Sequence, residues 1–165
     1  MAMTHKTTNS LDFILRRLEP GEAGQVTALN QLFSEAFGDD FGHGAYTAAE
    51  PSDRYLESLL AKPHVIPLVA IADNKIVGGL VAYVLDKFEQ ERSEVYIYDL
   101  GVAEAYRRRG IAPSLILELR KIAKTMGAWV IFVQADKDEA DLPARELYES
   151  LGEREDVFHY DIAVR

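Results

Sequence analysis

The spacing of hydrophobic and polar residues changes along the chain between a helical period and an alternating one. Both periods recur, which predicts an α/β fold. Short glycine-, proline- and asparagine-containing segments separate the elements, as turns do. The predicted strands are 13–18, 65–72, 76–88, 94–102, 129–133 and 157–164, and the predicted helices are about 26–37, 53–61, 111–126 and 143–151.

The clearest helix is the one over residues 111–126. Its apolar stripe runs from Ile111 to Met126 at spacings of four, four, three and four residues. Because this helix connects the strands at 94–102 and 129–133, we expect those two strands to be parallel neighbours or near neighbours. The strand at 129–133 is continuously apolar, which predicts burial on both faces.

The chain of 165 residues fits a single domain, since it contains no repeat, linker or low-complexity tract. We expect residues 1–10 to form a disordered tail and residues 11–165 to form the domain. Its predicted architecture is a mixed, mostly antiparallel sheet flanked by helices, with one parallel pair of strands. The glycine-rich segment 38–50 is expected to be a loop of the kind that borders binding sites.

Composition narrows the function classes. The absence of cysteine excludes disulfides, thiolate metal sites and a cysteine nucleophile. No metal site is expected, because the acidic and histidine residues lack ligand spacing. A net charge of -9 argues against nucleic acid or an anionic membrane as partner; it either favours a cationic partner or serves solubility alone. With no signal peptide or membrane span in the sequence, we expect a cytoplasmic protein.

Residues 103–112 carry the most informative motif. Here Arg-x-x-Gly-x-Ala stands at 107–112, between a strand and an amphipathic helix. Gly110 and Ala112 let a ligand approach the main chain, and the free N–H groups of a helix start suit a pyrophosphate. The alternative is a strand-to-helix turn with solvated arginines. Neither a Walker loop nor a dinucleotide fingerprint is present, and the pattern favours a phosphate-bearing cofactor.

Three further features are candidates for the chemistry. Asp99 lies inside an aromatic, apolar strand, where a carboxylate needs a partner or a role; it serves either as a general base toward an amine or as a structural group. The acidic run 136–141 either holds a polycation or is a solvated loop that caps the next helix. Tyr148 lies on the apolar face of the last predicted helix, so it is either a core residue or a catalytic one.

Taken together, these segments resemble the GNAT superfamily of N-acetyltransferases, and within it the gentamicin-type aminoglycoside 3-N-acetyltransferases. The resemblance covers about residues 25–162. The segments that carry it are Lys87-Phe88-Glu89-Gln90, Arg92-Ser93-Glu94, Tyr96-Ile97-Tyr98-Asp99-Leu100, Arg108-Arg109-Gly110-Ile111-Ala112 and Val133-Gln134-Ala135-Asp136.

The resemblance implies a role for each group of residues. Asp99 and Tyr148 would be catalytic, Asp99 at the amine and Tyr148 as proton donor to the departing thiolate. The acetyl-CoA site would be Leu100, Gly101, Val102, Arg107, Arg108, Arg109, Gly110, Ile111 and Ala112, with Gly101 where the subfamily has alanine. The substrate site would be Glu89, Glu94, Tyr98, Asp136, Asp138 and Glu139.

The function expected from this resemblance is transfer of acetyl from acetyl-CoA to the 3-amino group of a gentamicin-type aminoglycoside, which would confer antibiotic resistance. Strand-end amides would stabilise the oxyanion. No metal is implied, and a homodimer is one option for the assembly. Two alternatives stay open. The first is a GNAT enzyme acting on a polyamine or another small amine, and the second is a non-catalytic acyl-CoA-binding module.

Overall fold

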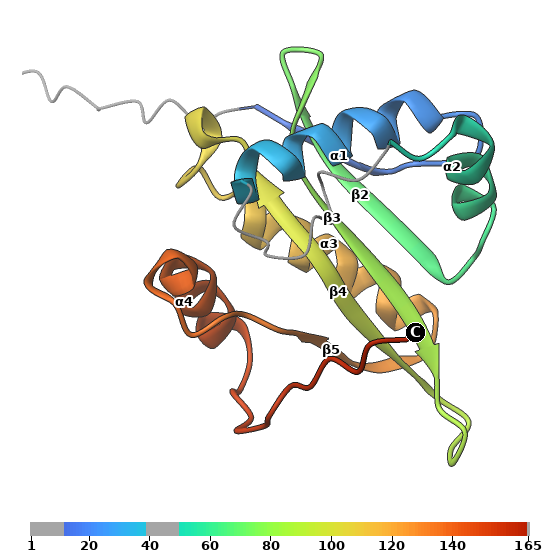
Figure 1. Ribbon diagram of the computed structural model, residues 1–165, viewed down its shortest axis with the longest axis vertical. Helices are drawn as coiled ribbons and strands as arrows, with labels where there is room; N and C mark the ends of the chain where they lie inside the picture. The colour runs from blue at the N-terminus through green and yellow to red at the C-terminus, as the bar shows by residue number, and fades with distance from the viewer. Residues whose placement is uncertain (1–11, 39–49, 165) are drawn as a thin grey trace, which may run out of the picture. The chain divides into compact units, whose positions relative to one another are not determined.

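Five strands form one mixed sheet in the order β1-β2-β3-β4-β5 (Figure 1). The computed structural model describes residues 12–38 and 50–164. The strands β1 to β4 pair antiparallel, whereas β4 and β5 pair parallel, which confirms the expected parallel pair and the fold class. The strands are β1 (Ile14–Arg17), β2 (Val65–Ala72), β3 (Lys75–Asp86), β4 (Ser93–Val102) and β5 (Ala128–Val133).

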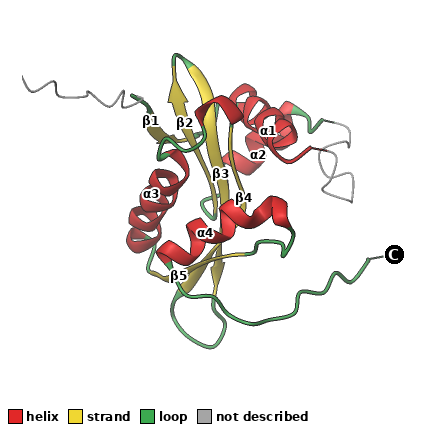
Figure 2. Cartoon of the chain, turned by 90° about the vertical axis from the view of Figure 1, so that its left-hand side faces the viewer, coloured by secondary structure: helices red, strands yellow, loops and turns green. Residues whose placement is uncertain are grey.

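Three helices pack on this sheet, with α3 on one face and α1 and α2 on the other (Figure 2). The helices are α1 (Ala23–Phe37), α2 (Asp53–Leu60) and α3 (Ile111–Thr125). The start of α2 is fixed by Ser52, whose Oγ accepts the N–H of Tyr55 at 3.3 Å. Serine is one of the small polar residues that helices favour at the N-cap.

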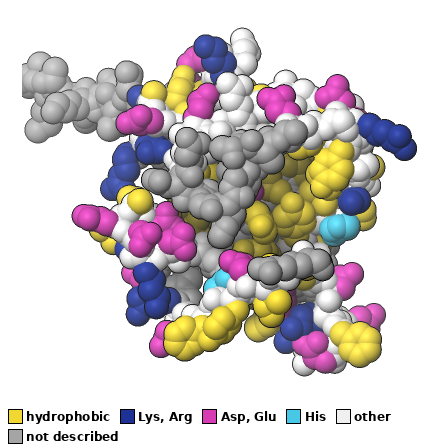
Figure 3. Space-filling view, in the orientation of Figure 1, with side chains coloured by type: hydrophobic (Ala, Val, Ile, Leu, Met, Phe, Trp, Pro, Cys, Tyr) yellow, Lys and Arg dark blue, Asp and Glu magenta, His cyan; other side chains and the backbone are white. Residues whose placement is uncertain are grey.

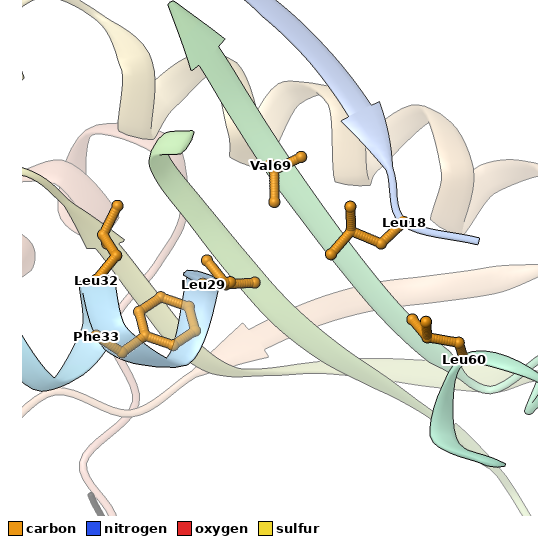
Figure 4. Close-up of a cluster of buried hydrophobic side chains, with 6 residues drawn as sticks. All are labelled: Leu18, Leu29, Leu32, Phe33, Leu60 and Val69. Carbon is orange, nitrogen blue, oxygen red and sulfur yellow. The ribbon is translucent and has the colours of Figure 1, made fainter. Parts of the chain in front are cut away.

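Helix α1 is held on the sheet by a buried cluster (Figure 4). Its members come from α1, from the end of α2, from β2 and from the residue after β1. Because each is almost fully buried, the cluster fixes α1 and α2 against the same sheet face. The members are Leu18, Leu29, Leu32, Phe33, Leu60 and Val69.

Glycines on neighbouring strands allow the helices to approach the sheet closely. A Cβ atom built on Gly79 would lie 2.5 Å from Cδ1 of Leu29 in α1, and one on Gly101 would lie 3.0 Å from Cδ1 of Phe33. Gly79 and Gly101 are paired in register between β3 and β4. Side-chain-free positions on both strands therefore determine where α1 lies, and α1 covers this end of the sheet.

Strand β5 differs from the prediction that residues 129–133 are buried on both faces of the sheet. It is an edge strand, and the side chains of Trp129 and Phe132 are 56% and 36% exposed. The prediction of burial on both faces is wrong. A continuous apolar run is typical of a strand that is covered twice, but it does not report the position of the strand in the sheet order.

By contacts the chain divides into two compact units, one up to Val133 and one from Gln134 onward. The second unit contains the single turn η3 (Glu139–Asp141), helix α4 (Leu142–Leu151) and an extended segment. The predicted tail 1–10 and most of the predicted loop 38–50 lie outside the described residues.

The predicted strand 157–164 is wrong, because the structure assigns no strand to the described residues after α4. The apolar side chains at alternate positions there, Phe158, Tyr160, Ile162 and Val164, are between 78% and 102% exposed. Alternation supplies a pattern that fits a strand, but a strand also needs a neighbouring edge for its N–H and C=O groups.

Candidate active site

A β-bulge in β4 lies next to Asp99. Val81 of β3 pairs with Asp99 and Ala82 pairs with Ile97, so Tyr98 is one extra residue in β4. A bulge bends the strand and redirects the side chains around it. The bulge is at Tyr98 and not at Gly101, which pairs regularly with Gly79.

The pairing of β4 with β5 ends immediately before the bulge at Tyr98. Their parallel ladder runs from Ser93 and Ala128 to Ile97 and Val133, whereas β4 continues to Val102. The β5 side of residues 98–102 thus lies outside this ladder. Main-chain N–H and C=O groups at such an edge can bind an extended ligand in the way that another strand would. Leu100, Gly101 and Val102 lie in this segment.

Asp99 is half-buried beside tyrosines of two strands. Burial, followed by the negative charge of Asp99, raises the pKa of the Tyr83 hydroxyl. The pKa of Tyr96 is raised as well, first by burial, then by the electrostatic interaction with Tyr98 and then by the charge of Asp99. Both phenols therefore stay protonated near neutral pH, and Asp99 is a carboxylate in a partly desolvated, aromatic setting. Such a group can accept a proton from an ammonium ion or hold it in place.

The loop after β4 has the geometry of an anion site. Arg108 and Gly110 both have left-handed backbones, with φ of 61° and 82°. Gly110 caps α3 without a side-chain hydrogen bond. The first turn of a helix leaves N–H groups without intrahelical acceptors. In α3 these are the groups of Ile111 and Ala112, because Pro113 has no N–H and Ser114 donates to Gly110 at 3.1 Å.

Two of the three arginines of this loop, Arg107 and Arg109, contact nearby groups. Arg107 ties the loop to the strand end, since its Nε donates to the carbonyl oxygen of Val102 at 3.1 Å. The guanidinium of Arg109 lies 5.6 Å from the centre of the Tyr106 ring in η2 (Glu104–Tyr106). A Cβ on Gly110 would meet nothing within 4 Å, so no described residue beyond its chain neighbours crowds this position. These features fit a pyrophosphate.

In the first unit, the two acidic residues predicted to bind the substrate, Glu89 and Glu94, interact with other side chains of the same chain. Lys87 forms ion pairs with Glu89 at 2.9 Å and with Glu94 at 3.3 Å. The indole N–H of Trp129 also donates to Glu94, at 3.2 Å. Tyr98, by contrast, is 64% exposed and lies edge-on to Tyr83 and Tyr96.

The second unit holds the remaining predicted residues. Arg145 donates to the main-chain oxygens of Asp136 and Asp138, and the carboxylate of Asp141 accepts the N–H of Asp136 at 2.9 Å. The side chains of Asp136, Asp138 and Glu139 are exposed. On α4, burial and the charge of Asp141 raise the pKa of Tyr148 to about 12. Tyr148 therefore keeps its proton and can act as a donor.

Sequence reasoning missed Tyr83, Tyr96 and Phe132 as site candidates. Tyr96 stacks on Phe132 across β4 and β5, with ring centres 4.8 Å apart. Their only signal in the sequence is aromatic residues on strands, which is also typical of a core. Among the described residues there is no group of three or more acidic or histidine side chains placed to hold a metal ion. None of the described helices has the length and apolar character needed to cross a membrane.

Comparisons with known proteins place this geometry in a family. The model of the acetyltransferase (GNAT) family matches residues 26–152. A comparison with curated proteins gives no match. Among solved structures, the aminoglycoside acetyltransferase HMB0005, from an uncultured soil metagenomic sample, is 48% identical with a TM-score of 0.88, covering 93% of this chain and 99% of that one.

Two more structures extend the comparison. The aminoglycoside acetyltransferase meta-AAC0020 in complex with sisomicin, also from an uncultured soil metagenomic sample, is 30% identical with a TM-score of 0.81, covering 93% of this chain and 97% of that one. The ribosomal-protein-alanine N-acetyltransferase of Brucella melitensis biovar Abortus 2308 is 23% identical with a TM-score of 0.70 over 93% and 99% of the two chains, and shares the fold. The chain therefore belongs to the acetyltransferase (GNAT) family, whose enzymes use acetyl-CoA as acetyl donor.

Proposed function

We propose that this acetyltransferase acts on an aminoglycoside of the gentamicin type, at the 3-amino group of the 2-deoxystreptamine ring. The observation that carries the substrate class is the 48% identity, over 93% of the chain, to an aminoglycoside acetyltransferase. The second relative is in complex with sisomicin, which supports the same class. The 3-N position rests on the sequence resemblance over about residues 25–162.

In this proposal, the strand end and the following loop of the first unit hold acetyl-CoA, which supplies the acetyl group as an activated thioester. The N–H groups of Ile111 and Ala112, with the left-handed backbones at Arg108 and Gly110, face the pyrophosphate. The β4 edge from Leu100 to Val102 binds the extended arm and polarises the acetyl carbonyl. Arg107 keeps loop and strand end together.

Asp99 and Tyr148 handle protons. An alkyl ammonium has no lone pair, so the substrate amine must lose a proton before it attacks. Asp99 accepts this proton, directly or through water, or orients the amine. Tyr148 stays protonated because of its raised pKa and donates to the departing sulfur. The nitrogen loses its second proton as the amide forms, and that proton returns to Tyr148 through solvent. Acetylation removes one positive charge from the drug, which would weaken its binding to ribosomal RNA and confer resistance.

The experiment that tests this function is thiol release from acetyl-CoA by the purified protein. The acceptors are gentamicin, an aminoglycoside without a free 3-amino group, and spermidine. We expect rapid release with gentamicin and little with the other two. Release with spermidine alone would contradict the aminoglycoside assignment and indicate a polyamine acetyltransferase, which the net charge of -9 also fits. Binding of acetyl-CoA with no turnover would indicate a non-catalytic module.

Replacing Tyr148 by phenylalanine is expected to lower kcat by no more than about 10²-fold, the lower end for a general acid, because water can protonate a thiolate. The pH profile gives a sharper test. A tyrosine acts as an acid below its pKa, so an unperturbed one would lose its proton near pH 10. With a pKa of about 12, Tyr148 loses activity only above that range. Identical kcat values for Tyr148→Phe and the wild type from pH 7 to 10 would assign donation to water.

A further inference from the structure

Four aromatic rings from three strands form a contiguous cluster on the sheet. Tyr96 and Phe132 are register partners in β4 and β5, with rings stacked at 4.8 Å and 10°. Tyr83 of β3 is the register partner of Tyr96 on the other side. Tyr98, the bulged residue, lies edge-on to both tyrosines, at 5.9 Å from Tyr83 and 5.6 Å from Tyr96. We call these four residues the aromatic platform.

Unlike the side chains of a core cluster, two side chains of the platform are accessible to solvent. Tyr98 is exposed, and Phe132 stands at the edge of the sheet with a third of its surface accessible. Figure 3 shows hydrophobic side chains gathered in the part of the molecule where Figure 1 draws β3 and β4. Exposed apolar surface of this kind is unfavourable in water, and it marks binding sites more often than scattered apolar residues do.

The negative charge of Asp99, next to the platform, favours a cationic ligand. Asp99 follows Tyr98 directly, and its charge acts on the hydroxyls of Tyr83 and Tyr96. The phenols stay protonated and can donate to hydroxyl groups of a ligand. The ring faces attract ammonium groups and the apolar C–H face of a sugar ring. A polyhydroxylated, cationic ring satisfies all of these contacts, whereas a linear polyamine offers ammonium groups but no ring face.

We propose that the aromatic platform binds a ring of a cationic aminosugar by stacking and thereby makes the enzyme prefer aminosugars over linear polyamines. This inference rests on the proposed function and assigns a specificity role to Tyr83, Tyr96 and Phe132. Asp99 at the edge of the platform then meets the amine that the stacked ring presents. The residues of the platform bind the substrate; they exchange no proton with it.

The test uses Phe132→Leu, which keeps an apolar side chain and removes the ring. We expect the KM for gentamicin to rise by roughly tenfold, since one aromatic contact is worth about a factor of ten. The KM for acetyl-CoA and the low kcat/KM for spermidine are expected to stay unchanged. Phe132→Tyr restores the ring and should restore the KM. Phe88→Leu is the matched control, because Phe88 is a fully exposed aromatic residue in the hairpin between β3 and β4.

Several outcomes would overturn the inference. One is an unchanged gentamicin KM in Phe132→Leu, and another is an equal fall in kcat/KM for gentamicin and spermidine. A change of oligomeric state in Phe132→Leu by size-exclusion chromatography would make the platform an interface between copies of the chain. Thermal melting of each variant checks that the fold is intact.

Calorimetric titration with gentamicin separates failure of this inference from failure of the proposed function. Tenfold weaker binding by Phe132→Leu supports the platform even if the wild type proves unable to acetylate gentamicin, in which case only the proposed function fails. Equal binding by both proteins overturns the platform whatever the turnover. A wild type that neither binds nor acetylates any aminoglycoside overturns both.

Discussion

Replacing Asp99 by asparagine is expected to lower kcat with gentamicin by about 10²- to 10⁴-fold, the range for loss of a general base. Asparagine has nearly the same shape, and Asp99 is half-buried at the bulge, so the fold should be retained. The variant cannot accept a proton from the substrate ammonium. The measurement is thiol release under saturating acetyl-CoA, with circular dichroism as a check on folding.

The pH dependence distinguishes a base from an orienting group. Without a base, the enzyme depends on the small fraction of substrate amine that is already neutral. That fraction grows about tenfold per pH unit below the amine pKa, so the Asp99→Asn rate should climb with pH up to that value. Asp86→Asn is the matched control, an exposed carboxylate at the end of β3, and should keep wild-type kcat. Near-wild-type turnover in Asp99→Asn would remove Asp99 from the mechanism.

Replacing Gly79 by alanine is expected to lower the free energy of unfolding by about 1–3 kcal/mol, the usual effect of overpacking a core. The new Cβ would lie 2.8 Å from the main-chain oxygen of Leu68, which belongs to the paired strand β2, and 2.5 Å from Cδ1 of Leu29. The leucine side chain can rotate, but the strand oxygen is held in the ladder. In a chain of this size the melting temperature should fall by roughly 3–10 °C.

Gly24→Ala is the control for this change. Gly24 lies in α1, and a Cβ there would meet nothing within 4 Å. Alanine is the better helix former, so this variant should gain about 0.5–1 kcal/mol. If Gly79→Ala melted at the wild-type temperature, the close approach of α1 to β3 would not be a packing constraint.

Local chemistry was enough for the sequence to determine most elements and the loop after β4. The stripe that begins at Ile111 predicts α3, and the predicted helix over 53–61 corresponds to α2. The loop proposed to hold the cofactor could be predicted because all its groups, from Arg107 to Ala112, are contiguous and their geometry follows from one strand-to-helix turn. The crossover helix likewise predicts the parallel pair β4 and β5.

Only the tertiary structure decided what surrounds Asp99. Periodicity reports which face of an element a residue occupies, but it does not report which residue of another strand lies opposite. The register that places Tyr83 and Phe132 on either side of Tyr96, and the bulge at Tyr98, are pairings between strands separated in the chain. The pairing of Glu89 and Glu94 with Lys87 depends equally on the hairpin fold.

The segment 157–164 also shows that a local pattern does not determine which strands pair. Its alternation is a local property, and the sequence predicts a strand from it; a strand also requires a partner edge, and the described part of the chain pairs none with it. Sequence patterns thus determined most elements of this protein and the contiguous loop that we propose binds a pyrophosphate. The tertiary structure decided the aromatic surroundings of Asp99, because these depend on hydrogen-bonded register between distant strands and on close helix contacts at Gly79 and Gly101.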